Sequence, residues 1–231
     1  SQAFALGART RRISPNAPVL SSHAVRIDHF RGLVGYWEVP RGEETAQRGC
    51  WREAPAEDLL RAVFRRYPEG RIVAEDLGEI TPDVRQIMHR FQLPGMKLLL
   101  FAFDPDNPDS SFLPHNIEPL AVAYTGTHDT NTVLGWFREE ADAGQKRRLS
   151  AYLGREPSAS EVPEELIRLA MMSQARLSIF PVQDLLALPS WARMNTPATS
   201  EGNWLWRMLP QQPGPEAEEW LLEATRTYGR L

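Results

Sequence analysis

Stretches with the character of strands alternate with stretches of helical periodicity along most of this chain, and this alternation limits the folds open to it. Apolar and β-prone runs predict strands at residues 24–28, 70–76, 96–104, 120–130 and 177–188, the last running into a turn. Apolar residues at helical spacing predict helices at residues 56–67, 81–93, 136–153, 161–176 and 214–228. Strands and helices in alternation are typical of parallel βα units, so we predict an α/β fold.

The first 23 residues stand outside this pattern. They contain two prolines, four serines and a cluster of arginines, and they show no period. Such a composition is typical of irregular chain. We therefore predict an irregular arm over residues 1–23 and a single structural region over residues 24–231.

Composition and charge exclude several classes of function. The net charge is −4 and the isoelectric point about 5.8, which gives no support to nucleic-acid binding. No apolar run approaches the roughly 18 residues of a membrane span, and residues 9, 11 and 12 are arginines where a signal peptide has its apolar core. Cys50 is the only cysteine, so an internal disulfide is impossible. We expect a soluble cytoplasmic protein that binds neither nucleic acid nor membrane.

Acidic residues follow every predicted strand. Because the carboxyl ends of parallel strands are where sites are built, this placement indicates a site at that edge of the sheet. A single acid at a strand end is more often a helix cap or an ion-pair partner, but acids at all five ends repel one another and need a functional reason. The acids concerned are Asp28, Glu75 with Asp76, Asp104, Asp129 and Asp184.

Two carboxylates on either side of a scissile bond are what glycoside cleavage needs. Asp28 is the candidate nucleophile, because Arg26 lies two residues earlier on the same face of the strand and favours its ionised form. Glu75 is the candidate general acid, because burial beside the apolar run "RIVA" favours its protonated form. Asp129 is a third acid that can hold sugar hydroxyls, with His128 beside it as a donor.

Aromatic and histidine side chains leave more alternatives open. Each of the seven tryptophans is either a core residue or a platform for stacking a sugar, and Trp204 and Trp206 alternate, so at most one of them is expected to reach a sugar. His29 and His115 fit a structural role and a catalytic role equally well. The sequence has no H-E-x-x-H, C-x-x-C, G-x-G-x-x-G or P-loop, so we expect no metal and no cofactor.

Seven segments together resemble the 4-α-glucanotransferases, also called amylomaltases or disproportionating enzymes. They follow one another in the order of that family, and the resemblance covers about residues 24–210. The segments are "RIDHFRGLVGYWEVP" (26–40), "AEDLGEITPDV" (74–84), "LPGMKLLLFAFD" (93–104), "FLPHN" (112–116), "YTGTHDTNT" (124–132), "ARMNTPAT" (192–199) and "GNWLWRM" (202–208).

The resemblance implies a (β/α)₈ TIM-type barrel of which this chain supplies about strands 4–8, an incomplete barrel. It implies Asp28 as the nucleophile, Glu75 as the general acid/base and Asp129 as the stabiliser of the transition state, all three around one glucose ring. Arg26 and His128 resemble the companions of those acids, and Asp104 and Asn195 match positions that bind glucose hydroxyls. The implied substrates are maltooligosaccharides or α-1,4-glucans, with no cofactor.

The sequence also departs from the family. The first three strands of the family have no counterpart here, and residues 1–23 do not resemble the helix that precedes the nucleophile. "REAPAE" (52–57) stands where the family usually has a Gly-Pro-Gly turn, Ala198 replaces a usual glycine, and Thr130-Asn131 replaces the commoner Asn-Asp.

Three functions are therefore weighed. The leading one is a retaining glucan transferase, and the nearest alternative is an α-amylase-type hydrolase. The third is an inactive piece of such an enzyme, or one that depends on a partner, such as a missing N-terminal half. Five strands of an eight-strand barrel leave two open edges, which favours this third interpretation.

Overall fold

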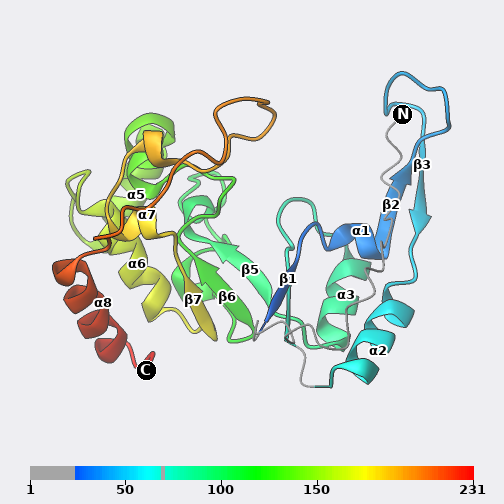
Figure 1. The fold of residues 1–231 in the computed structure, drawn as a ribbon, viewed down its shortest axis with the longest axis horizontal. Coiled ribbons are helices and arrows are strands. Elements are labelled where there is room, and N and C mark those ends of the chain that lie inside the picture. The colour runs from blue at the N-terminus through cyan, green and yellow to red at the C-terminus, as the bar shows by residue number, and fades with distance from the viewer. Residues whose placement is uncertain (1–23, 69–70) are drawn as a thin grey trace. The chain divides into compact units, whose positions relative to one another are not determined.

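A computed structural model describes residues 24–68 and 71–231, and the expected arm at residues 1–23 lies outside this range. The described residues form two compact units, one that ends at Gly95 and one from Met96 to Leu231, which are described separately (Figure 1). The mixed α/β class predicted from the alternation is confirmed in both units.

The described part of the first unit is built on a pair of parallel strands and the helices that cover them. β1 pairs with β4 in the register Ile27↔Ala74, and every residue of β4 is buried. One apolar cluster joins these strands to α2 and α3, with Phe30, Leu60 and Val84 at its centre. The elements are β1 (Val25–Ile27), α1 (Arg31–Val34), β2 (Gly35–Glu38), β3 (Cys50–Glu53), α2 (Ala56–Arg66), β4 (Ile72–Ala74) and α3 (Pro82–Arg90).

Two features of this unit differ from the sequence-based expectation. β1 is not buried: Val25 is 56% exposed, and among the described residues β1 pairs on one edge only. The chain also forms an antiparallel hairpin of β2 and β3, in which Trp37 lies opposite Trp51 and their rings meet edge to face at 5.5 Å. No strand was expected here, because the hairpin is exposed almost throughout and lacks the alternation that marks a half-buried strand.

The second unit has a three-stranded sheet in the order β5-β6-β7, with β6 and β7 parallel. β6 is buried along its whole length, as its continuous apolar run predicts. The elements are β5 (Gly95–Leu98), β6 (Ala121–Tyr124), α4 (Val133–Gly135), α5 (Ala143–Leu153), α6 (Val162–Met172), β7 (Leu177–Ile179), α7 (Val182–Leu185) and α8 (Pro215–Thr227), with short 3₁₀ turns at Leu99–Phe101, Pro114–Asn116 and Ser190–Ala192. Gly95 alone of these residues falls within the first unit.

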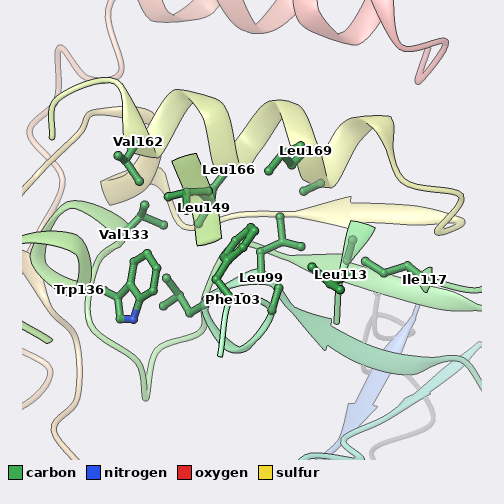
Figure 2. Close-up of a cluster of buried hydrophobic side chains, with 14 of the residues drawn as sticks. Leu99, Phe103, Leu113, Ile117, Val133, Trp136, Leu149, Val162, Leu166 and Leu169 are labelled. Carbon is green, nitrogen blue, oxygen red and sulfur yellow. The ribbon is translucent and has the colours of Figure 1, made fainter. Parts of the chain in front are cut away.

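The core of the second unit lies between this sheet and α6. Figure 2 shows Leu166 and Leu169 on α6 above Leu99 and Phe103, with Trp136 at one end of the cluster. α6 begins with Val162 and Pro163 after Glu161, and most of its residues are buried. This close packing fixes the loops that follow β6.

The helix expected over residues 136–153 is two elements. A π-helical turn over Trp136–Glu140 ends at Ala141, and α5 begins after Asp142. The Asp142 carboxylate accepts the Gln145 N–H, and the Gln145 side chain accepts the Asp142 N–H, which is a capping box. The D-x-x-Q spacing marks this boundary in the sequence.

All five expected strands end earlier than predicted, and for β5, β6 and β7 the difference moves the acids away from the strand ends. β5 ends at Leu98 and β6 at Tyr124, so Asp104 and Asp129 lie in the loops beyond. Asp184 does not end a strand at all: Pro181 follows β7 closely, and Asp184 is buried in α7. The described part of the chain contains no helix long and apolar enough to cross a membrane.

Candidate active site

Asp28 lies immediately after β1, where the strand emerges from its pairing with β4. Its carboxylate is 73% exposed and lies 2.8 Å from the guanidinium of Arg26, two residues earlier. This ion pair between side chains of one strand face is the contact predicted from the spacing.

Glu75 lies immediately after β4, at the position next to Asp28 in the parallel register. Because Ile27 and Ala74 are partners, the residues that follow them leave the sheet at the same edge. Glu75 is half-buried, and its carboxylate accepts the N–H of His29 at 2.7 Å and that of Leu77 at 2.8 Å.

His29 connects these two acids through its backbone. Its φ of +47° lies in the left-handed region, which is uncommon for a residue other than glycine. In this conformation its N–H donates to Glu75 Oε2, and the following Phe30 N–H donates to the Glu75 carbonyl at 3.1 Å. Backbone strain of this kind is concentrated at functional sites. The His29 backbone thus holds Glu75 against the end of β1.

In the second unit, Asp129 forms a cluster with two other residues predicted for the site. Asn195 Nδ2 donates to Asp129 Oδ1 at 2.6 Å, and His128 Nε2 lies 3.2 Å from Asp129 Oδ2. The Asn195 N–H also donates to the His128 carbonyl at 3.0 Å. The segments at 124–132 and 192–199 are therefore joined at the residues singled out from the sequence.

Arg193 holds this cluster together and was not singled out from the sequence. Its guanidinium donates to the carbonyls of Asp129 and Asn195 at 2.8 Å each, and lies 3.2 Å from the Glu140 carboxylate. The signal was available, because Arg193 lies two residues before Asn195 in a segment already compared with the family. Thr127, His128, Arg193 and neighbouring residues line a cavity of about 110 Å³.

Two other candidates occupy different surroundings. Asp104 is exposed in a turn, where its carboxylate accepts the Asp106 N–H at 3.0 Å and Arg148 donates to its carbonyl. His115 Nδ1 lies 2.9 Å from the Tyr152 hydroxyl, and the two rings stack. These contacts favour the structural role for His115. Burial raises the pKa of Tyr152.

Asp184, the acid at the fifth predicted strand end, has surroundings that give it a structural role. It is 2% exposed, accepts the Thr125 hydroxyl at 2.6 Å and accepts the Val133 N–H at 2.8 Å. It thereby ties the end of β6 and the start of α4 to α7. Burial raises the pKa of Asp184 to about 6, and the two hydrogen bonds partly offset this effect.

Comparison with known proteins decides which family carries this arrangement. Residues 16–212 match the family described as 4-alpha-glucanotransferase, beginning eight residues before the boundary expected from the motifs. The chain belongs to the 4-alpha-glucanotransferase family.

Named relatives agree with this family. The chain is 49% identical over 202 residues to the 4-alpha-glucanotransferase of Thermus thermophilus, covering 84% of this chain and 40% of that protein. It is 43% identical over 206 residues to that of Aquifex aeolicus, covering 89% of this chain and 41% of the relative. The chain thus spans about two fifths of the length of these 4-alpha-glucanotransferases.

A solved structure agrees as well. The amylomaltase from Streptococcus agalactiae in complex with acarbose superposes with a TM-score of 0.82 at 34% identity, covering 89% of this chain and 41% of that one. The amylomaltase from Corynebacterium glutamicum, at 18% identity and a TM-score of 0.65, supports the fold.

Proposed function

We propose that this chain is the part of a 4-α-glucanotransferase that carries its catalytic acids, and that it moves segments of α-1,4-glucan between maltooligosaccharides. The observation that carries the proposal is the position of Asp28 and Glu75. Each follows a residue paired in the parallel register of β1 and β4, within a chain that belongs to this family. Neighbouring strands lie about 4.8 Å apart, which suits the separation of about 5–5.5 Å between carboxyl groups in retaining enzymes.

The proposed reaction has two displacements. Asp28 attacks the anomeric carbon of a glucan and forms a β-glucosyl-enzyme, while Glu75 gives its proton to the departing 4-oxygen. Glu75 then takes the proton from the 4-hydroxyl of a second glucan, whose oxygen displaces Asp28 and restores the α-linkage. To donate first, Glu75 must exchange one of its two backbone hydrogen bonds for a bond to the glycosidic oxygen.

The other predicted residues receive roles in binding. Asp129 is proposed to stabilise an oxocarbenium-like transition state, with Asn195 and His128 as its companions. Arg26 forms an ion pair with Asp28 and is proposed to position its carboxylate. Asp104 is proposed to bind a glucose hydroxyl, on the resemblance of its segment alone.

The proposal extends to the architecture. We infer a (β/α)₈ barrel of which this chain contributes about strands 4–8. Support comes from the coverage of about two fifths of each relative. The activity is accordingly proposed to need the remaining part of the barrel, on the same polypeptide or as a partner. We propose the cytoplasm as its compartment, although the rice relative is named chloroplastic/amyloplastic.

The test is product analysis with maltotriose. The 231-residue chain is incubated alone and with the complementary three fifths of the Thermus thermophilus relative. Transfer between two maltotriose molecules yields glucose with maltopentaose, or maltose with maltotetraose, and longer glucans follow. Asp28→Asn lowers the rate by about a thousandfold or more, as loss of a nucleophile does elsewhere. Asp109→Asn, an exposed acid of the second unit, is the matched control. Mainly glucose and maltose, or no product in either mixture, contradicts the proposal.

A further inference from the structure

Trp204 combines exposure with a strained backbone. Trp204 is 51% exposed, and its backbone φ is +62°. The left-handed region costs a bulky residue about 1–2 kcal/mol, so the surrounding chain must hold Trp204 there. Exposure and strain together need an explanation that core packing does not supply.

The loop of residues 194–204 provides the holding contacts and is drawn in orange in Figure 1. The Trp204 N–H donates to the Met194 carbonyl at 2.6 Å and closes the loop. Inside it, the Asn203 side chain accepts the Thr196 N–H at 2.8 Å and donates to the Thr199 carbonyl at 3.1 Å. A loop that is hydrogen-bonded internally presents its indole with little conformational freedom left to lose on binding.

The indole lies beside the Asp129 cluster. Its ring centre is 5.3 Å from that of His128, with the planes inclined at 34°. His128 in turn lies 3.2 Å from Asp129, which accepts the Asn195 amide. Aromatic, carboxylate and amide groups therefore gather within one unit of the chain.

This combination suits one kind of ligand. A glucose ring has a face of C–H groups that packs on an aromatic surface, and a rim of hydroxyls that hydrogen-bond to carboxylate and amide groups. We propose that Trp204 is the platform on which a glucose unit of the glucan stacks while Asp129 and Asn195 bind its hydroxyls. The inference rests on the proposed function and adds to it a binding residue from the segment 202–208.

The loop gives this platform a fixed position. Asn195 lies at the start of the loop and Trp204 at its closure, so the bond from Trp204 N–H to Met194 O holds the backbones of these two residues near each other. Trp206, the other tryptophan of this segment considered as a platform, is only partly exposed. The Arg207 guanidinium donates to the backbone carbonyls of both Trp204 and Trp206.

The experiment measures binding of maltotriose to the 231-residue chain by isothermal titration, with saturation-transfer NMR as a second readout. Trp204→Ala is expected to raise Kd about tenfold, and Trp204→Phe, which keeps a ring, to stay within about threefold of the wild type. Trp191→Ala, which removes an indole from a residue 69% exposed, is expected to leave Kd unchanged. Circular dichroism checks that each variant is folded.

The outcomes separate this inference from the function on which it rests. Equal binding by Trp204→Ala and the wild type overturns the platform and leaves the transferase proposal standing. Equal loss in Trp204→Phe and Trp204→Ala also overturns it, since the ring then does not carry the effect. Absence of maltotriose binding by the wild-type chain overturns the platform, and the product analysis then judges the transferase proposal separately.

Discussion

At the scale of single residues, Ala198 shows what a departure from a family pattern does physically. The family usually has glycine here, and the φ of Ala198 is +63°. In this region a β-carbon meets the backbone, at a cost of about 1 kcal/mol or more. The strain lies within the loop that ends at Trp204.

We therefore expect Ala198→Gly to raise the free energy of unfolding by up to about 1 kcal/mol, because relief of strain exceeds the entropy that glycine adds to the unfolded chain. Urea denaturation followed by fluorescence measures this change. Ala151→Gly, at an exposed position inside α5, serves as the control and should lower stability by about 1 kcal/mol. A decrease in both variants would contradict strain at Ala198.

Asp184 should make the stability of the folded chain depend on pH, and the sign of this dependence follows from its raised pKa. Its pKa is about 6 in the folded chain against an ordinary 3.8, so the folded state binds this proton more tightly than the unfolded state does. The contribution of Asp184 to stability is therefore fully present below about pH 4 and is lost as the pH rises through about 6. Two pKa units correspond to about 3 kcal/mol as an upper bound.

The expected outcome is measured as a difference between the wild type and Asp184→Asn. An asparagine keeps an acceptor for the Val133 N–H, and its amide N–H can donate to the Thr125 hydroxyl, which reverses that hydrogen bond, but it does not titrate. Relative to the wild type, the variant should gain stability between pH 4 and pH 7, by up to about 3 kcal/mol. A constant difference across this range in urea titrations would show that the buried carboxylate does not titrate there.

At the scale of elements, sequence periodicity predicted the helices that pack on one face and missed the hairpin that is exposed to solvent. The helix at residues 56–67 and that at 214–228 were found within two residues of their bounds, because one face of each packs against the rest of its unit. The β2–β3 hairpin was missed because both of its faces meet solvent. An exposed strand carries no alternation to detect.

Burial of the neighbouring strands also explains which residues of the candidate site could be predicted from the sequence. Asp28, Glu75 and the Asp129 cluster follow buried or paired strands, so their places were visible in the sequence. Asp184 was predicted at a strand end because a short apolar run does not distinguish a strand from a helical turn. In the structure Pro181 is the N-cap of α7, and Asp184 lies in that helix. Arg193 was missed because its role depends on carbonyls of Asp129 and Asn195, which no pattern of side chains reveals.

At the scale of the whole molecule, the two units differ in how much core each one has. Among the described residues, the main apolar cluster of the second unit contains 17 buried side chains, and that of the first unit contains 7. Burial of apolar area is the main source of stability, and a small core leaves a unit marginal. The second unit should therefore fold without the first.

We expect a fragment of residues 95–231, which keeps all of β5, to unfold cooperatively in urea with a sigmoidal loss of helical circular dichroism. A fragment of residues 24–95 should show a shallow transition, since Val25, Trp37 and Trp51 are exposed and its cluster is small.

Leu166 is fully buried in the main cluster of the second unit and is labelled in Figure 2. Leu166→Ala should destabilise the longer fragment by about 2–5 kcal/mol, because it leaves a cavity in that cluster. If the longer fragment melts without cooperativity, or if Leu166→Ala leaves its midpoint unchanged, the cluster around α6 is not an independent core, and folding must then involve residues from both units.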